Sequence, residues 1–336
     1  MKIAQIGCGY WGRNLFRVFT SMRDVEVAIC CDEDPKGREA AKSISPNVET
    51  CEDIETVLGR DDIDAVVIAT PAGLHHAQAK RVLEAGKHVL VEKPLATSVR
   101  EAEELVGLAE AKKRILMVGH TFLYNDAVRW IKNYIQQGEL GDIYYTYFHR
   151  LNLGRVRQDV DVIWNLAPHD VSICQYWYNE TPSRVEAHGI SYLQSGIADV
   201  GFLNMYFASG RFAHIHVSWL DPHKVRGAVI VGNKKMLVYD DASQDQKVVI
   251  YNKGIDKKGG NVESFSFDSY ADFQLVLRAS DIWIPRVDFR EPLQVEARHF
   301  VTCVMEGKPP LTDGRNGVEV VRTLEMASDL RGIKPK

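Results

Sequence analysis

The chain has 336 residues, of which 45% are hydrophobic and 26% are charged, and its formal net charge is −4. This length favours two domains, and the apolar fraction is sufficient for packed cores. A mildly acidic chain has no overall attraction for nucleic acid or for an anionic membrane, and no apolar run approaches the roughly 18 residues of a membrane span. We therefore expect neither nucleic acid nor a membrane as a partner.

The six cysteines are scattered along the sequence, and no two of them have the Cys-x-x-Cys spacing of a metal site or a redox motif. We expect reduced, mostly buried thiols, as in a cytoplasmic protein, and no bound metal.

The first stretch, residues 2–32, predicts a dinucleotide site. An apolar strand over 3–6 leads into a Gly-rich turn, a helix over 13–21 and a second strand over 25–31. The first Gly of such a turn permits a tight bend, the second lets the backbone approach a pyrophosphate, and the third lets helix and strand pack closely. The strand, turn and helix context favours this interpretation over an ordinary connection. The turn reads Gly7-Cys8-Gly9-Tyr10-Trp11-Gly12.

Asp32 closes the second strand and sharpens the prediction. A carboxylate at this position accepts hydrogen bonds from the adenosine ribose hydroxyls and repels a 2′-phosphate. Glu33 follows it and adds a second negative charge. The sequence therefore predicts NAD as the cofactor in preference to NADP.

Residues 33–121 continue to alternate short apolar runs with amphipathic segments, as a doubly wound parallel sheet requires. We predict helices over 35–44, 53–58, 75–85 and 98–113, and strands over 48–50, 65–69, 88–91 and 115–119. Ligands bind beyond the carboxyl ends of such strands. The rim around Gly7 and Asp32 should therefore also contain Thr70-Pro71, Glu92-Lys93-Pro94 and Gly119-His120.

Beyond residue 122 the pattern becomes rich in strands. A helix over 126–137, an aromatic strand-forming segment over 142–150, a loop over 152–161 and a helix over 164–178 come first. Strands over 184–192, 200–207, 211–219, 226–232, 236–240 and 248–252, joined by short turns, argue for an antiparallel sheet open on one face. A Gly-rich mobile loop over 253–263 and helices over 291–306 and 314–330 follow.

The predicted fold class is α/β. A Rossmann domain with a doubly wound parallel sheet covers residues 1–122, and an α+β domain with a large, mostly antiparallel, open-faced sheet covers 123–336.

Several motifs carry a resemblance to a known family. They are the Gly-rich turn, Thr70-Pro71 with His75 shortly after it, Glu92-Lys93-Pro94, Gly-Glu-Leu-Gly-Asp at 138–142, His169-Asp170, and Pro-Pro-Leu-Thr-Asp-Gly at 309–314. Together, over essentially the whole chain, they resemble the NAD(P)-dependent oxidoreductases of the glucose–fructose oxidoreductase, inositol dehydrogenase and rhizopine-catabolism family.

This resemblance implies a set of site residues. Lys93 would lie between nicotinamide and substrate, and His169 would serve as acid or base. The family usually has Asp where this chain has Asn165, which can hydrogen-bond a hydroxyl but cannot take a proton, so the proton falls to His169 or Lys93. Cofactor contacts are expected from Gly7, Gly9, Tyr10, Trp11, Gly12, Asp32, Thr70, Pro71, His75, Glu92, Lys93 and Pro94.

The chemistry of these side chains suits the oxidation of a secondary alcohol, which needs a base for the hydroxyl proton. A histidine of ordinary pKa near 6.5 accepts a proton near neutral pH. Beside a nicotinamidium, like charge would disfavour the protonated form of Lys93, which could then hold or relay the proton. The choice between His169 and Lys93 stays open, as do a core role for His169 and a surface role for Lys93.

Residues 150–157 include three arginines in an acidic chain. Such a cluster suggests bidentate binding of phosphate or carboxylate, which a nucleotide diphosphosugar needs and free inositol or glucose does not. A solvated charged face is the alternative. Substrate contacts are expected from Lys93, His120, Tyr124, Arg150, Asn152, Arg155, Arg157, Asn165 and His169.

The predicted function is NAD-dependent oxidation of a secondary hydroxyl of a nucleotide-linked sugar. The resemblance favours C3 of UDP-N-acetylglucosamine or its uronate, giving a 3-keto sugar. The alternatives are reduction of a TDP-3-ketosugar, dehydrogenation of inositol or a free sugar, an NAD-dependent glycosidase, and a sugar or NAD sensor without catalysis.

His214 and His216 are two residues apart on a predicted strand, a spacing that could bind metal, but no third ligand is in register. They fit a sheet face better. Because members of the family commonly pair such faces, we expect a homodimer or homotetramer formed through the C-terminal sheet.

Overall fold

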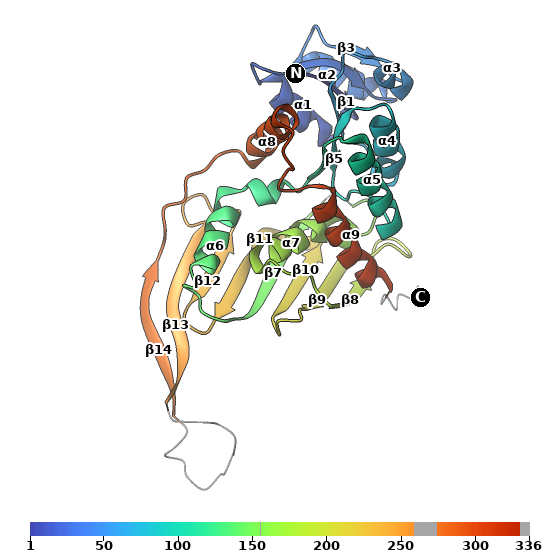
Figure 1. Ribbon diagram of the computed structural model, residues 1–336. Helices are drawn as coiled ribbons and strands as arrows, with labels where there is room; N and C mark the ends of the chain where they lie inside the picture. The colour runs from blue at the N-terminus through green and yellow to red at the C-terminus, as the bar shows by residue number, and fades with distance from the viewer. Residues whose placement is uncertain (155, 259–273, 330–336) are drawn as a thin grey trace.

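The computed structural model describes residues 1–154, 156–258 and 274–329. Its N-terminal part contains a six-stranded parallel sheet in the order β3-β2-β1-β4-β5-β6 (Figure 1). With β1 near the centre and the chain winding outward on both sides, this is the doubly wound arrangement that the alternating pattern predicts. The strands are β1 (Lys2–Ile6), β2 (Glu26–Cys31), β3 (Glu49–Cys51), β4 (Ala65–Ile68), β5 (His88–Glu92) and β6 (Leu116–Gly119).

Three of the helices between these strands begin at capping side chains. Asp34, Asp53 and Ser98 each accept a hydrogen bond from a backbone N–H in the first turn of the following helix, which satisfies donors that the helix itself leaves unpaired. One helix begins three residues earlier than predicted, directly after Pro71. The helices are α1 (Gly12–Thr20), α2 (Pro35–Ile44), α3 (Ile54–Leu58), α4 (Ala72–Glu84) and α5 (Val99–Lys112).

The second sheet has eight strands in the order β14-β13-β12-β11-β7-β10-β9-β8. Its neighbours pair antiparallel, except that β7 and β10 run parallel, so the sheet is mostly antiparallel as predicted. The strands are β7 (Ile143–Leu153), β8 (Arg184–Ile190), β9 (Val200–Tyr206), β10 (Phe212–Ser218), β11 (Leu220–Gly232), β12 (Met236–Asp240), β13 (Val248–Lys258) and β14 (Gln274–Trp283).

Two predicted loops are wrong in part. β7 continues through Leu153, so residues 152 and 153 belong to a strand, because pairing with β11 extends that far. Likewise β13 continues through Lys258 by pairing with β14, a strand that the sequence analysis does not predict, and the two project from the body as a hairpin (Figure 1). Pairing across strands has overridden the weak strand propensity of this polar segment. The end of that predicted loop, 259–263, lies outside the described residues.

Helices cover one face of the second sheet, and Figure 1 shows α6, α7 and α9 lying across it. The main core lies between these helices and the strands, and includes Trp177, Phe148, Ile215 and Leu324. The short helix η1 (Thr121–Tyr124) leads out of the first sheet. The remaining helices are α6 (Asp126–Gln136), α7 (Val162–Tyr178), α8 (Pro292–Glu306) and α9 (Gly314–Asp329).

The last two helices pack against the N-terminal part of the chain as well. Phe300 of α8 shares a core with Ile3 and Leu15, and Val321 of α9 packs among residues of the parallel sheet and its helices, such as Val91. The domain boundary after residue 122 stays a prediction. The N-terminal sheet thus receives part of its packing from residues beyond 291.

The six cysteines are free, and all but the half-buried Cys51 are buried, as predicted. Within the described ranges, no helix combines the length and the apolar character needed to cross a membrane.

Candidate active site

The Gly-rich turn forms a cradle of backbone. A Cβ on Gly12 would lie 2.3 Å from the carbonyl oxygen of Gly7, and one on Gly7, which has φ of +88°, would lie 2.7 Å from the carbonyl oxygen of Ala69. A Cβ on Gly9 would meet nothing within 4 Å. The first and third glycines are therefore required by the packing of the protein, whereas the second borders open space. This is the arrangement that a pyrophosphate needs, so the cradle fits NAD.

The carboxylate of Asp32 lies beside this cradle. It accepts hydrogen bonds from the backbone N–H of Cys8 at 2.6 Å and of Asp34 at 2.9 Å. Arg38 donates to the carbonyl oxygens of Asp32 and Glu33, at 2.7 and 3.0 Å, and so brings a guanidinium to the same strand end. A 2′-phosphate on the cofactor would therefore lie near both the negative charge of Asp32 and the positive charge of Arg38.

His75 joins two segments of the predicted rim. Its imidazole is buried and contacts the carbonyl oxygens of Pro94 at 2.7 Å and Thr70 at 2.9 Å, while burial lowers its pKa. Thr70 also donates to Gln78 at 2.6 Å, and Pro71 directly precedes α4. His75 therefore lies behind the cavity and holds its rim together.

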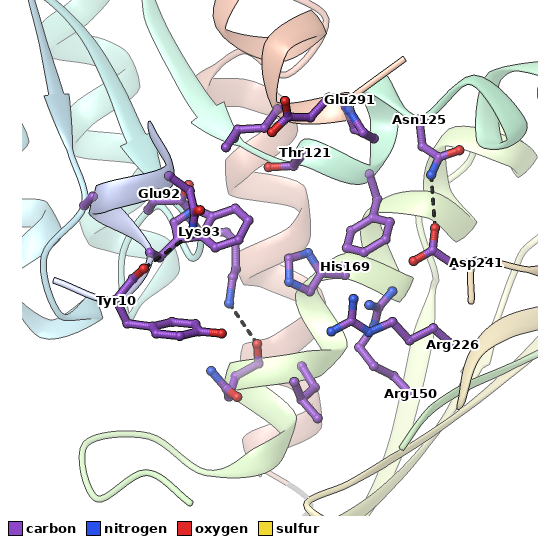
Figure 2. Close-up of a pocket in the computed structure, with 18 of the residues that line it drawn as sticks. Tyr10, Glu92, Lys93, Thr121, Asn125, Arg150, His169, Arg226, Asp241 and Glu291 are labelled. Atoms are coloured by element: carbon purple, nitrogen blue, oxygen red, sulfur yellow. Dashed lines mark hydrogen bonds between the residues drawn. The ribbon is translucent and has the colours of Figure 1, made fainter. Parts of the chain in front are cut away.

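A cavity of about 590 Å³ opens at the carboxyl ends of β4 and β5, between them and α7 (Figure 2). Its walls come from both ends of the chain, including the start of α8. Predicted site residues that line it are Tyr10, Trp11, Thr70, Glu92, Lys93, Arg150, Arg157, Asn165 and His169.

Lys93 reaches into this cavity from the end of β5. Its Nζ donates to the carbonyl oxygen of Asn165 at 2.9 Å (Figure 2). Burial lowers the pKa of Lys93 to about 8, although the neighbouring carboxylate of Glu92 opposes the shift. The amine is therefore mostly protonated at neutral pH and can lose its proton slightly above it.

Glu92 is the buried neighbour of this amine. Its Oε1 accepts from Trp11 Nε1 at 2.5 Å, and burial raises its pKa to about 7. A second buried carboxyl group, Glu296 of α8, accepts from Thr121 Oγ1 at 2.8 Å. Burial and the charge of Glu92 raise the pKa of Glu296 well above its usual range. Glu296 is not among the predicted residues, because only the packing of α8 brings it here.

His169 lies on α7, between Lys93 and a pair of arginines in Figure 2. Its ring packs edge-on against Phe122, with ring centres 5.0 Å apart, and its Nδ1 has no hydrogen-bond partner among the described residues. Burial, together with the positive charges of Lys93 and Arg150, holds the pKa of His169 well below 6.5. The imidazole is therefore neutral and able to accept a proton.

Two arginines of the predicted cluster, Arg150 and Arg157, are already paired within the protein. Arg150 is a strand residue whose Nε and Nη2 bond both oxygens of Asp170, at 3.0 and 2.7 Å, with both side chains buried. Arg157 likewise bonds both oxygens of Asp159, at 2.8 and 2.6 Å, but this pair is half-exposed. Arg155 lies outside the described residues. The guanidinium of Arg150 is therefore held by Asp170 in the wall of the site and is not a free anion-binding group.

Three further predicted substrate residues do not line the cavity. The Tyr124 hydroxyl lies 3.0 Å from Thr312 Oγ1, and its ring is buried in a core. His120 is 1% exposed, and neither of its ring nitrogens has a hydrogen-bond partner among the described residues. Burial lowers its pKa to about 3. Both face inward from the segment around η1, so direct substrate contact is not supported. Asn152 lies on β7 near Gly154.

Several lining residues come from positions that no sequence motif marks. Asn125 Nδ2 donates to Asp241 Oδ1 at 3.1 Å (Figure 2), and Lys247 Nζ donates to the Asp241 carbonyl oxygen at 3.0 Å. Arg226 lies on β11, directly opposite Arg150 on β7. Strand pairing places Arg226 in the site, and tertiary contacts place the others, so no local signal could have found them.

Two family models match the chain. The oxidoreductase family with an NAD-binding Rossmann fold matches residues 1–120, and the GFO/IDH/MocA C-terminal domain matches residues 128–238. The chain therefore belongs to the GFO/IDH/MocA family of oxidoreductases, and its N-terminal part is an NAD-binding domain of that family.

Individual relatives are more distant. The 2,7-anhydro-N-acetylneuraminate hydratase of Mediterraneibacter gnavus is 28% identical, over 62% of this chain and 59% of that protein. The UDP-N-acetylglucosamine 3-dehydrogenase of Acidithiobacillus ferrooxidans is 28% identical, over 65% of this chain and 67% of that protein. A solved structure of the latter enzyme, GnnA, has a TM-score of 0.81 at 23% identity and covers 98% of this chain and 97% of its own. The chain spans less than two thirds of the length of several curated relatives that it matches.

Proposed function

We propose that this protein oxidises a secondary hydroxyl, at C3, of a nucleotide-linked sugar such as UDP-N-acetylglucosamine or its uronate, with NAD as the hydride acceptor. The observation that carries the proposal is the presence of Lys93 and His169 in one cavity, at the rim that holds the Gly-rich cradle. The relative named a UDP-N-acetylglucosamine 3-dehydrogenase supports the substrate class.

The roles of the two groups follow from their protonation. NAD bound at the cradle supplies the hydride acceptor. The neutral imidazole of His169 takes the hydroxyl proton as general base, because its low pKa leaves it unprotonated at neutral pH. The Lys93 ammonium, held by the Asn165 carbonyl, donates a hydrogen bond to the same oxygen and fixes its position.

The diphosphate needs cations near the mouth of the cavity. Arg157 is half-exposed there and can exchange Asp159 for a phosphate with little loss, since exposed ion pairs contribute only about 0–1 kcal/mol. We assign the diphosphate to Arg157.

The test is a panel of nucleotide sugars with NAD, followed by the absorbance of NADH, alongside thermal shifts with NAD and NADP. Lys93→Met and His169→Asn should abolish NADH formation and leave the thermal shift with NAD intact. Lys80→Met and His223→Asn, at exposed positions away from the cavity, serve as matched controls. Release of sugar from an aryl glycoside without net NADH would instead identify a glycosidase, and NAD binding without any turnover would identify a sensor.

The reverse reaction is the second candidate. With a pKa of about 8, Lys93 is mostly protonated at neutral pH and suits the donation of a proton to a ketone oxygen. A TDP-3-ketosugar with NADH therefore belongs in the same panel.

We propose that a second copy of this chain binds to the open face of the second sheet. Opposite the helices it carries a half-exposed set of rings, in which Phe202 stacks on His216 at 4.4 Å and Tyr147 meets His149 at 5.1 Å. No group of three or more His, Cys, Asp or Glu suited to a metal occurs in the described chain. Tyr147→Glu should reduce the mass found by analytical ultracentrifugation, whereas Tyr192→Glu, at an exposed loop, should not.

A further inference from the structure

Arg226 is a cation of the cavity whose guanidinium has no bonded partner among the described residues. It is half-buried on β11 and lines the cavity next to Arg150 (Figure 2). Its guanidinium makes no hydrogen bond and no ion pair with the part of the chain that the structure describes. Burial, and then the like charge of Arg150, lower the pKa of Arg226, but a guanidinium stays charged at any physiological pH.

The nearby carboxylates of Asp241 and Asp170 favour this charge, since both oppose the lowering of the pKa of Arg226, but neither bonds to its guanidinium. Asp170 uses both oxygens on Arg150. Asp241 accepts through one oxygen from Asn125 and from Tyr239, both at 3.1 Å, and lies beyond ion-pair distance of Arg226. A half-buried guanidinium whose N–H groups have no acceptor is stabilised by an anion that bonds to it directly. Because Arg226 lines the cavity, we infer that this anion comes from a ligand.

The position of Arg226 says which part of the ligand carries that anion. Its charge acts on His169, the proposed base, and both side chains face the same part of the cavity in Figure 2. Lys247 lies on the same side, and its ammonium uses one of three donors on the Asp241 carbonyl. Arg157, at the half-exposed mouth, is the cation we assign to the diphosphate. The anion at Arg226 therefore belongs to the ring that reacts.

We propose that the reacting sugar ring carries a carboxylate, and that Arg226 is the residue that selects it over a neutral sugar. A carboxylate offers two coplanar oxygens that match the two parallel N–H groups of a guanidinium. This inference rests on the proposed function for its substrate class and narrows it from nucleotide sugars in general to nucleotide-linked uronates.

The experiment compares UDP-N-acetylglucosamine with UDP-N-acetylglucosaminuronic acid, which differ at the carboxylate, on wild-type protein, Arg226→Met and Arg226→Lys. Wild type should prefer the uronate in kcat/KM. Arg226→Met should lower the value for the uronate by roughly 10- to 100-fold, as for a lost charged hydrogen bond, and that for the neutral sugar by less than about threefold. Arg226→Lys should recover part of the loss, and Arg184→Met, at an exposed site on β8, should change neither value.

An equal loss for both substrates would assign Arg226 to the diphosphate and overturn the proposal, as would a wild-type preference for the neutral sugar. If wild type oxidises neither compound, the proposed function fails, and the anion site is judged by binding alone. In that case free glucuronate, but not glucose, should raise the melting temperature of the NADH-loaded wild type and not that of Arg226→Met. Equal shifts in the two proteins would overturn the carboxylate site as well.

Discussion

Asp170→Asn tests the buried ion pair that frames the site. The side chains of Asp170 and Arg150 are 3% and 6% exposed, and the carboxylate holds the guanidinium by two hydrogen bonds. Removing the negative charge leaves Arg150 as a buried cation beside Arg226. Because breaking a buried pair leaves an uncompensated charge, we expect the free energy of unfolding to fall by about 3–5 kcal/mol.

The assay is urea unfolding of the ligand-free protein, followed by tryptophan fluorescence and by circular dichroism. Replacing both partners, as Arg150→Met with Asp170→Leu, should recover most of the loss, because no buried charge is then left alone. The matched control is Asp159→Asn, which breaks the half-exposed pair with Arg157 and should lower stability by less than about 1 kcal/mol.

A loss from Asp170→Asn no larger than that of the control would refute this reasoning. It would mean that Arg150 does not depend on Asp170 for its charge, and would return Arg150 to the set of groups able to bind a substrate anion.

Three more predictions follow from the site. Oxidation should slow as pH rises through about 8, the pKa of Lys93, because the ammonium that holds the substrate oxygen is then lost, and Glu92→Gln should move this inflection of kcat to lower pH, because the Glu92 carboxylate raises that pKa. Glu296→Gln should raise the melting temperature at alkaline pH, since the raised pKa of Glu296 makes stability fall as pH rises above the ordinary carboxyl range; the gain should vanish below pH ~3, where the carboxyl is protonated in both states. Gly9→Ala should weaken NADH binding, measured by NADH fluorescence, without lowering the melting temperature, whereas Gly12→Ala should lower both.

The N-terminal half of the fold was predictable because its signals are local. Apolar runs, Gly-rich turns and capping residues such as Ser98 mark each strand and helix within a few residues. The ends of strands were harder. β14 and the extension of β13 form by pairing with each other, and their polar sequence does not predict this pairing.

The residues of the site also divide into those with a local sequence signal and those without one. Lys93 and His169 are found from motifs, and the structure brings both into one cavity. Arg150 is visible in the sequence, but its pairing is not, because Asp170 lies on a different element. Arg226 and Glu296 have no local signal, since each reaches the site through tertiary packing.

The packing of α8 and α9 against the N-terminal sheet has a consequence for synthesis on the ribosome. The cofactor domain emerges first, but its core lacks Phe300 and Val321, and the cavity lacks Pro292 and Leu293, until these helices are translated. A nascent chain can therefore form the six-stranded sheet early, yet it exposes the apolar surface that α8 will cover while more than 150 further residues are made. Folding of the cofactor domain is therefore completed only after α8 and α9 have been synthesised.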